Sequence, residues 1–326
     1  MKEKGFRNYL QKRKLDAKDI DFSVDAVKEF EKHLREKKTT LESASPDALK
    51  EYILLLIKGR RNSRNRLIAL MRYCRYTKKT DFFIYFTSIL GAANVLPDMG
   101  ERLAAVAGKE IRDRVFQGFE MPPLGSPQED YPRLTKHVIE RMEAELPLEK
   151  CKEVITWNYH KVPAESFKEA KERFEKAASI DEYLKDAHRR LVEELESCMK
   201  KGEPWWEQEI TPEVIEFVKK DQEMTGVRIG NKIYNTKIPY APKYFLKEKD
   251  PTMRKYYACH CQLVRTAIRD GEPKIPSIFC YCSAGYHKVH FDVIFGEPVK
   301  IELLETVLKG DPRCRFAITI PKRKLK

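Results

Sequence analysis

The sequence is poor in glycine, with 14 glycines among 326 residues, and it lacks long apolar runs. No Gly-x-Gly-x-x-Gly and no phosphate-loop motif occurs, so a nucleotide cofactor held by such a loop is not expected. The most apolar run, residues 82–96, is too short to span a bilayer, contains Asn94 and is followed by Pro97. This run predicts a buried helix and no membrane partner.

The first residues, "MKEKGFRNYLQKRK", also lack the apolar core of a signal peptide. A cytoplasmic location is therefore predicted, and with it a reducing environment. In such an environment the eight cysteines are expected to be thiols or metal ligands rather than disulfides.

Charge is present in excess and is unevenly distributed. Residues 1–81 contain 22 Lys and Arg against 12 Asp and Glu, which places +10 of the formal net charge of +13 in the first quarter of the chain. Residues 58–79 contain nine basic residues and no acidic one. Such a run is typical of a surface that binds a polyanion, and equally of a helix with a solvated cationic face.

Length and composition indicate a globular protein of two or three domains, with 42% hydrophobic and 35% charged residues. We predict a helical, basic domain over residues 1–118, a linker with bracing helices over 119–226, and a Cys-rich α+β domain over 227–326. Ser23, Ser45 and Ser63 each precede a helical pattern of apolar residues and are predicted to cap it.

The residue pattern of the last hundred residues differs from that of the preceding helical segments. Short alternating runs around Gly230-Asn231 and around Lys309-Gly310-Asp311-Pro312 predict two antiparallel hairpins. The segments "QLVRTAIRDG" and "SAGYHKVHFDVIFG" predict helices. The predicted fold class is therefore α+β, with helical N-terminal and middle regions and a C-terminal domain of helices plus antiparallel hairpins.

The first 80 residues resemble the SAM-like core-binding domain of tyrosine recombinases. The resemblance lies in "FRNYLQKRKL", "AVKEFEKHL", "LESASPDALKEYILLL" and "NSRNRLIALMRYCRY". In that family the domain clamps DNA, but no catalytic domain of the recombinase type follows here, so recombinase activity is excluded. The resemblance implies possible DNA contacts through phosphate-binding arginines, and the candidates are Arg60, Arg61, Arg64, Arg66, Arg72 and Arg75.

Five of the eight cysteines lie in the last 68 residues, and four of them form the Cys-x-Cys pairs Cys259/Cys261 and Cys280/Cys282. Thiolates with a nearby imidazole favour zinc, whereas the usual cysteine runs of an iron–sulfur cluster are absent. Residues two apart point in nearly opposite directions on a helix. If both pairs are helical, a metal site would use one sulfur from each pair together with Cys314.

The block "CYCSAGYHKVHFDVIFGEPVKIELLETVLKGDPRCRF" resembles the C-terminal half of the 4-vinyl-reductase domain, a small-molecule-binding module. In its zinc-binding members three cysteines and a strand glutamate hold the metal. The resemblance carries three of these ligands to Cys282, Glu305 and Cys314, and the fourth falls at Leu308, which cannot bind a metal. The candidates for that place are Cys261, Cys259, His260 and Cys280.

The same block resembles the L-2-amino-thiazoline-4-carboxylate hydrolase family, through Cys261 ahead of "QLVR", Cys280 or Cys282, and the closing segment Gly310-Asp311-Pro312-Arg313-Cys314-Arg315-Phe316. This resemblance implies a cysteine-dependent hydrolase of a small carbon–nitrogen substrate. The candidate nucleophile is Cys261, with Arg265 as an assisting or substrate-binding residue. The whole Cys-rich signature also resembles that of an uncharacterised family, which implies no function.

Three functions therefore compete. The first is a small-molecule-binding protein, such as a ligand sensor, with a zinc site in its C-terminal domain. The second is the cysteine-dependent hydrolase. The third is a DNA-binding regulator that acts through the basic N-terminal helices, and a bland alternative to all three is that the cysteines are small core residues.

Overall fold

The computed structural model describes residues 1–325 and divides the chain into two compact units. Unit 1 comprises residues 1–93 and 121–130, and unit 2 comprises residues 94–120 and 131–325. The chain thus leaves unit 1 after residue 93 rather than at residue 118. Part of the segment predicted as a linker, residues 121–130, belongs to unit 1.

Unit 1 is helical. It consists of α1 (Glu3–Lys12), α2 (Ala17–Glu36), α3 (Pro46–Lys58), α4 (Arg64–Tyr76), α5 (Thr80–Ala92) and the 3-10 helix η1 (Gln128–Asp130). Ser45 and Ser63 cap α3 and α4 as predicted. The prediction for Ser23 is wrong, because Asp16 caps α2 and Ser23 lies inside that helix, where its hydroxyl donates to the carbonyl of Asp19.

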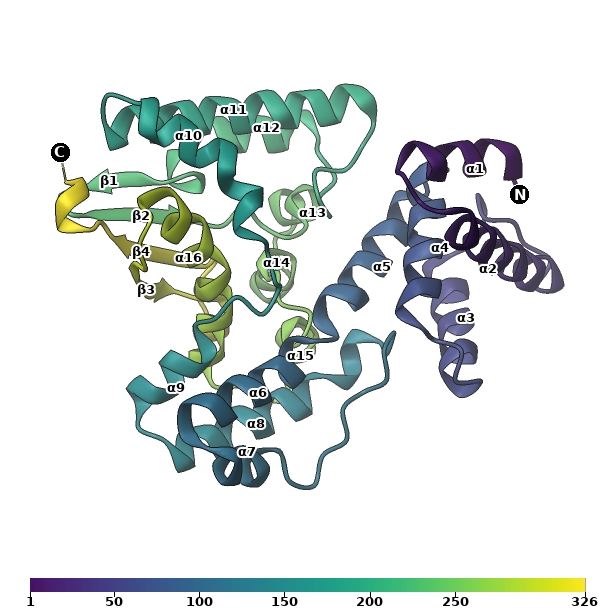
Figure 1. Cartoon of the computed structure of the whole chain (residues 1–326), viewed down its shortest axis with the longest axis horizontal. Helices are drawn as coiled ribbons and strands as arrows, with labels where there is room; N and C mark the ends of the chain where they lie inside the picture. The colour runs from purple at the N-terminus through teal and green to yellow at the C-terminus, as the bar shows by residue number, and fades with distance from the viewer. Residues whose placement is uncertain (326) are drawn as a thin grey trace. The chain divides into compact units, whose positions relative to one another are not determined.

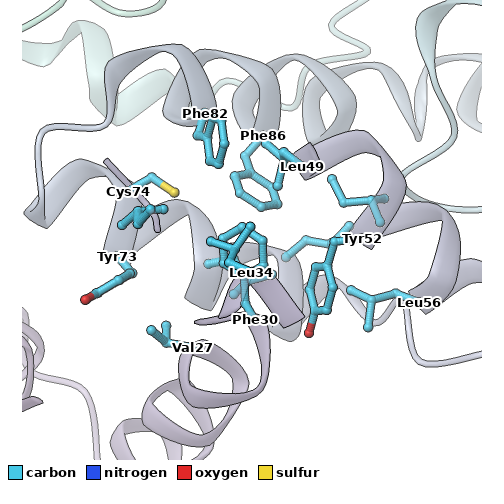
Figure 2. Packing of buried hydrophobic residues seen from close by; sticks show 14 of the residues in the cluster. Val27, Phe30, Leu34, Leu49, Tyr52, Leu56, Tyr73, Cys74, Phe82 and Phe86 are labelled. Carbon is cyan, nitrogen blue, oxygen red and sulfur yellow. The ribbon is translucent and has the colours of Figure 1, made fainter. Parts of the chain in front are cut away.

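The core of unit 1 collects the apolar faces of these helices (Figure 2). Phe30 of α2 and Tyr52 of α3 lie with ring centroids 4.8 Å apart, and Phe82 and Phe86 of α5 are fully buried. Cys74 lies among these side chains with no exposed surface and is a core residue. A core of this extent is sufficient for an independently packed unit.

Unit 2 begins with helices and ends with a mixture of helices and strands. Its α-helices are α6 (Val95–Ala107), α7 (Lys109–Phe116), α8 (Pro132–Glu145), α9 (Leu148–Ile155), α10 (Lys168–Lys176), α11 (Ile180–Lys201), α12 (Pro212–Lys220), α13 (Pro242–Lys247), α14 (Pro251–Ala258), α15 (Arg265–Asp270) and α16 (Tyr281–Phe295). Its 3-10 helices are η2 (Ala164–Phe167), η3 (Gln222–Met224), η4 (Ser277–Cys280), η5 (Val307–Lys309) and η6 (Lys322–Lys324).

The strands of unit 2 form one antiparallel sheet in the order β1-β2-β4-β3. They are β1 (Val227–Ile229), β2 (Lys232–Thr236), β3 (Lys300–Glu305) and β4 (Arg315–Thr319). β1 pairs with β2 across the turn at Gly230-Asn231, and β3 pairs with β4 across the segment that contains Gly310. Both predicted hairpins and the α+β class are therefore confirmed.

One face of the sheet is covered by α10, α11 and α16 (Figure 1). Phe316 and Ile318 of β4 point into this layer, where they meet Phe291 and Phe295 of α16. Residues two apart on a strand share a face, so the alternation in β4 follows the usual period. This layer holds the N-terminal end of α16, which carries Cys282, close to the sheet.

The apolar run predicted as one buried helix forms most of α5 and the start of α6, with a break at Ala93 and Asn94. The stretch Thr80–Ala107 is long and apolar enough to cross a membrane by length and composition alone. However, 56% of the most apolar window in this stretch is buried inside the protein. Core helices of this kind pass the same test, so the prediction of a buried segment stands.

Candidate functional site

The turn between β3 and β4 positions Cys314. Gly310 adopts a φ of +105°, which favours glycine, and lets the chain reverse after η5. The Asp311 carboxylate accepts a hydrogen bond from the Thr306 amide at 2.8 Å, which closes the turn. The amide of Lys237, just beyond β2, donates to the Cys314 carbonyl at 2.9 Å. The Gly-Asp-x-x-Cys segment is thus a turn that fixes Cys314 between η5 and β2.

Hydrogen bonding from the Cys280 thiol and the Val307 amide stabilises the thiolate form of Cys314, and the Thr306 hydroxyl, which donates to the Cys280 sulfur, acts in the same direction. The Cys280 hydrogen bond is the largest influence, and together these donors outweigh burial and lower the pKa of the Cys314 thiol. The same contact raises the pKa of Cys280 well above its usual value. Cys314 is therefore the thiolate of the pair and Cys280 the thiol.

Thr306 ties these two sulfurs together. Its Oγ1 lies 2.7 Å from the Cys280 sulfur, and its hydroxyl is also within hydrogen-bonding reach of Cys314. Thr306 itself is fully buried, directly after β3. Cys314, in contrast, keeps part of its surface in contact with solvent. Cys280 is consequently a buried residue, and Cys314 is a partly exposed one.

Lys237 adds a positive charge to the surroundings of Cys314. Burial lowers the pKa of Lys237, while the nearby thiols, Cys314 first, act in the opposite direction. Its Nζ donates to the Ser283 hydroxyl at 3.0 Å. Because a thiolate and an ammonium stabilise each other, Lys237 favours the charged form of Cys314. We refer to Lys237, Cys280, Thr306 and Cys314 as the thiolate cluster.

The remaining cysteines near the cluster are thiols of raised pKa. Burial raises the pKa of Cys259 to about 11 and that of Cys282 to about 12. Burial also raises the pKa of Cys261 well above its usual value, with Cys259 as the next influence. These three are poorer nucleophiles than Cys314, because the thiolate is the reactive form.

Two histidines lie close enough to Lys237 to feel its charge. Burial first, and Lys237 second, lower the pKa values of His260 and His287 well below the usual value, so both rings are neutral at pH 7. The Nε2 of His260 lies 2.7 Å from the carbonyl oxygen of Ile238. Since that oxygen only accepts, Nε2 carries the proton and Nδ1 carries the lone pair.

Arg265 is held by aromatic rings rather than left free. Its guanidinium lies 4.2 Å from the Tyr240 ring centroid and 4.3 Å from that of Tyr256, and it donates to the Tyr256 carbonyl at 3.2 Å. The residue is 4% exposed. Its amide donates to the Cys261 carbonyl, so Arg265 supports the loop that carries Cys261. Burial raises the pKa of Glu207, which hydrogen-bonds the Tyr240 hydroxyl.

The predicted zinc ligands do not assemble into a metal site. Within residues 1–325 no group of three or more His, Cys, Asp and Glu side chains is arranged to hold a metal ion. Glu305 faces Arg315 at 3.7 Å, and its side chain is 42% exposed. Cys282 lies on α16, whereas Cys280 interacts with Cys314 through its thiol hydrogen. The zinc site stays a prediction that this donor arrangement does not fit.

The predicted DNA-binding arginines of unit 1 are partly engaged within the protein. Arg61 and Arg66 both form ion pairs with Glu29 of α2, and Arg75 lies over the Phe83 ring at 5.0 Å. The other candidates are Arg60, Arg64 and Arg72, of which Arg60 and Arg64 are exposed. Intramolecular pairing reduces the positive charge that this surface offers to a phosphate backbone.

Sequence reasoning missed Lys237 and Thr306. The sequence did contain a sign that Lys237 points inward. Lys237 follows Ile233 and Asn235 at two-residue spacing, and both of those residues are buried on β2. A lysine at an inward-facing strand position is uncommon unless it has a partner. Thr306 carried no such signal, since a threonine after a strand is an ordinary residue.

Comparison with known proteins gives one match. The profile of a family of unknown function (DUF6144) matches residues 216–325, about a third of the chain. The matched segment contains the entire thiolate cluster, as well as β1 to β4. No curated protein and no solved structure matches the chain.

Proposed function

We propose that unit 2 is a cysteine-dependent hydrolase of a small molecule whose reacting carbon is bonded to nitrogen, with Cys314 as the nucleophile. The observation that carries this proposal is the arrangement of the Cys280 thiol, the Val307 amide and Lys237 around a partly exposed cysteine, where each favours the thiolate form. A structural cysteine needs no such donors, whereas a nucleophilic one needs a lowered pKa. The proposal keeps the predicted reaction class and moves the nucleophile from Cys261 to Cys314.

The reaction divides into two steps. The Cys314 thiolate attacks the electrophilic carbon, a carbon–sulfur bond forms, and the carbon–nitrogen bond then breaks. The leaving nitrogen takes a proton from the ammonium of Lys237, whose pKa is lowered by burial. Water then adds to the carbon that Cys314 holds, and the carbon–sulfur bond breaks to return the thiolate. The neutral Lys237 amine takes the proton that the water loses, which restores its ammonium.

The proposed reaction requires a reduced thiol. A reducing compartment such as the cytoplasm, which the sequence predicts, suits it. The ligand-sensing and DNA-regulating functions remain predictions, since no contact of the described residues favours them over the hydrolase.

The first test traps the acylated enzyme. The probe is 4-nitrophenyl acetate, an activated ester that acylates a nucleophilic cysteine with release of nitrophenolate. We expect a burst of about one equivalent per chain and an acetyl group on Cys314 in the peptide map. Cys314→Ala should abolish the burst and Lys237→Met should slow it. The matched control is Cys198→Ser, a partly exposed cysteine on α11.

A second assay measures ammonia or amine released from a panel of small carboxylated amides, amidines and thiazolines. A burst that persists in Cys314→Ala would overturn the proposal, as would turnover of the panel by that variant. Metal analysis of the freshly purified protein adds an independent result. Stoichiometric zinc that is lost in Cys314→Ala would make Cys314 a metal ligand rather than a nucleophile.

A further inference from the structure

A series of contacts between planar side chains leads from the interior of unit 2 to its surface at α13 and α14. The Arg265 guanidinium lies 4.2 Å from the ring centroid of Tyr240 and 4.3 Å from that of Tyr256. The Tyr257 centroid follows, 5.4 Å from that of Tyr256. Tyr244 then stacks on Tyr257 at 5.5 Å, with 26° between the two ring planes. We refer to these five side chains as the tyrosine series.

The two ends of the tyrosine series differ in exposure. Tyr240 and Arg265 are buried, whereas Tyr244 is 52% exposed. The backbone fixes the exposed end, because the amide of Ala241, directly before α13, donates to the Tyr257 carbonyl at 2.9 Å. Tyr244 is therefore an exposed ring that a second ring supports. Such a ring loses little conformational freedom when it binds a partner.

Cations accompany the exposed end of the series. Residues 242–257 contain five basic and two acidic residues. Lys247 lies three residues after Tyr244 on α13, and Arg254 lies three residues before Tyr257 on α14. Residues three apart on a helix share a face, so each of these cations is placed beside a tyrosine of the series.

The two acidic residues of this segment do not pair with these cations. Glu248 accepts a hydrogen bond from the amide of Asp250 at 2.9 Å, and Asp250 in turn caps α14. Lys247 and Arg254 are both exposed, and neither forms an ion pair within the described residues 1–325. Their charge is consequently available to an anionic partner.

We propose that the exposed end of the tyrosine series, together with Lys247 and Arg254, binds single-stranded nucleic acid. A base stacks on Tyr244 as the next planar group of the series, and the two cations contact neighbouring phosphates. Aromatic rings beside cations bind such strands in this way without choosing a sequence. None of these residues belongs to the thiolate cluster, so the proposal goes beyond the hydrolase and does not require it.

A single strand fits this surface better than a duplex does. A stacking ring needs an unpaired base, whereas a duplex keeps its bases stacked on one another. The unpaired cations favour a polyanion over an apolar partner, because phosphates complement their charge. A duplex bound as tightly as a single strand would thus contradict the role assigned to Tyr244.

The experiment uses the full-length chain and a fluorescein-labelled oligothymidylate of about 12 nucleotides as the probe. Fluorescence anisotropy at about 50 and 200 mM salt measures the dissociation constant. Tyr244→Ala should weaken binding about tenfold, whereas Tyr244→Phe keeps the ring and should bind as the unmodified sequence does. Arg254→Ala should also weaken binding and should reduce the slope of log affinity against log salt by about 0.7, the value for one phosphate contact.

Matched controls separate this surface from other aromatic and basic residues. Tyr286→Ala changes an exposed tyrosine of α16, and Arg64→Ala changes an exposed arginine of unit 1. Both variants should bind the probe as the unmodified sequence does. Loss of binding in Arg64→Ala, with Tyr244→Ala unaffected, would overturn the proposal and assign binding to unit 1. Absence of binding by the unmodified sequence at the lower salt concentration would overturn it as well.

A crosslink locates the contact directly. With 5-iodouracil in the probe, irradiation should attach the strand to Tyr244 in the peptide map, and a crosslink found only in unit 1 would refute the proposed surface. The hydrolase is tested separately. The probe should bind Cys314→Ala normally, and Tyr244→Ala should keep the nitrophenyl acetate burst, so either proposal can fail while the other stands.

Discussion

At the scale of single residues, hydrogen bonding rather than burial distinguishes Cys314 from the other cysteines. Cys74, Cys259 and Cys282 are buried, and burial raises their pKa values. Cys314 is also largely enclosed, but hydrogen bonding from Cys280 and Val307, with Lys237 nearby, lowers its pKa. The reactivity of this residue is therefore set by neighbours that come from η4, η5 and β2.

The contribution of one donor is testable with Thr306→Val, which removes the hydroxyl and keeps the shape of the side chain. A hydrogen bond to a charged group contributes about 1.5 kcal/mol, which corresponds to a shift of about one pKa unit. We expect the pKa of Cys314 to rise by about one unit from about 6, and iodoacetamide alkylation of Cys314 at pH 7 to slow by about twofold.

The pH dependence of the alkylation rate shows in which direction the pKa of Cys314 has shifted. In the unmodified sequence a lowered pKa keeps Cys314 as thiolate below the ordinary cysteine pKa of about 8.5, so its alkylation should persist as the pH falls from 8.5 to 7. In Thr306→Val the rate should already fall over that interval. The control is Thr319→Val on β4, outside the thiolate cluster. Equal rates in Thr306→Val and the unmodified sequence would contradict the role of this hydroxyl.

At the scale of elements, α16 approaches the chain after α9 closely enough to require a glycine. A Cβ added at Gly285 would lie 2.4 Å from both the amide nitrogen and the carbonyl oxygen of Trp157. Backbone atoms cannot move aside as a flexible side chain can. The position of α16 over the sheet therefore depends on this contact as well as on the apolar layer below it.

Gly285→Ala is expected to destabilise unit 2. Overpacking of this kind costs about 1–3 kcal/mol, and here the clash is with backbone. Urea unfolding monitored by the fluorescence of the tryptophans, all of which lie in unit 2, measures the loss. Gly91→Ala is the matched control for intrinsic helix propensity. A Cβ at Gly91 of α5 would meet no atom within 4 Å, so alanine should be neutral or slightly stabilising there, as read by circular dichroism.

At the scale of the whole molecule, each unit has a hydrophobic core of its own. Phe30 belongs to the core of unit 1, and Phe316 belongs to the core beneath the sheet of unit 2. Both side chains are completely buried. The thiolate cluster is made only of residues from unit 2.

Because each unit has its own core, a core substitution in unit 1 should leave the reactivity of Cys314 in unit 2 unchanged. Phe30→Ala and Phe316→Ala should each cost about 3–5 kcal/mol, because a large buried ring is lost. Only Phe316→Ala should also alter the rate of Cys314 alkylation, since Phe316 lies two residues from Cys314. Ile229→Ala, at a position 59% exposed on the edge strand β1, is the control and should change neither quantity. A slower alkylation rate in folded Phe30→Ala would contradict the separation.

Local patterns predicted a large part of this fold. Ser45 and Ser63 cap helices as expected, and both hairpins form around their glycine-containing turns. These features depend on residues close in sequence, so a single chain segment carries the information. Ser23 was assigned wrongly for the same reason: Asp16 offers an equally good cap seven residues earlier, and the helix extends back to it.

By itself the sequence determined the α+β class, the concentration of cysteines near the C-terminus and the turn that holds Cys314. Only the tertiary structure decided which cysteine is the thiolate, because Cys280, Thr306 and Lys237 lie up to 77 residues from Cys314 in the chain and meet it only when β2, η4 and η5 pack together. The pKa of a thiol depends on charges and donors within a few ångströms of the sulfur. Spacing along the chain does not specify those distances.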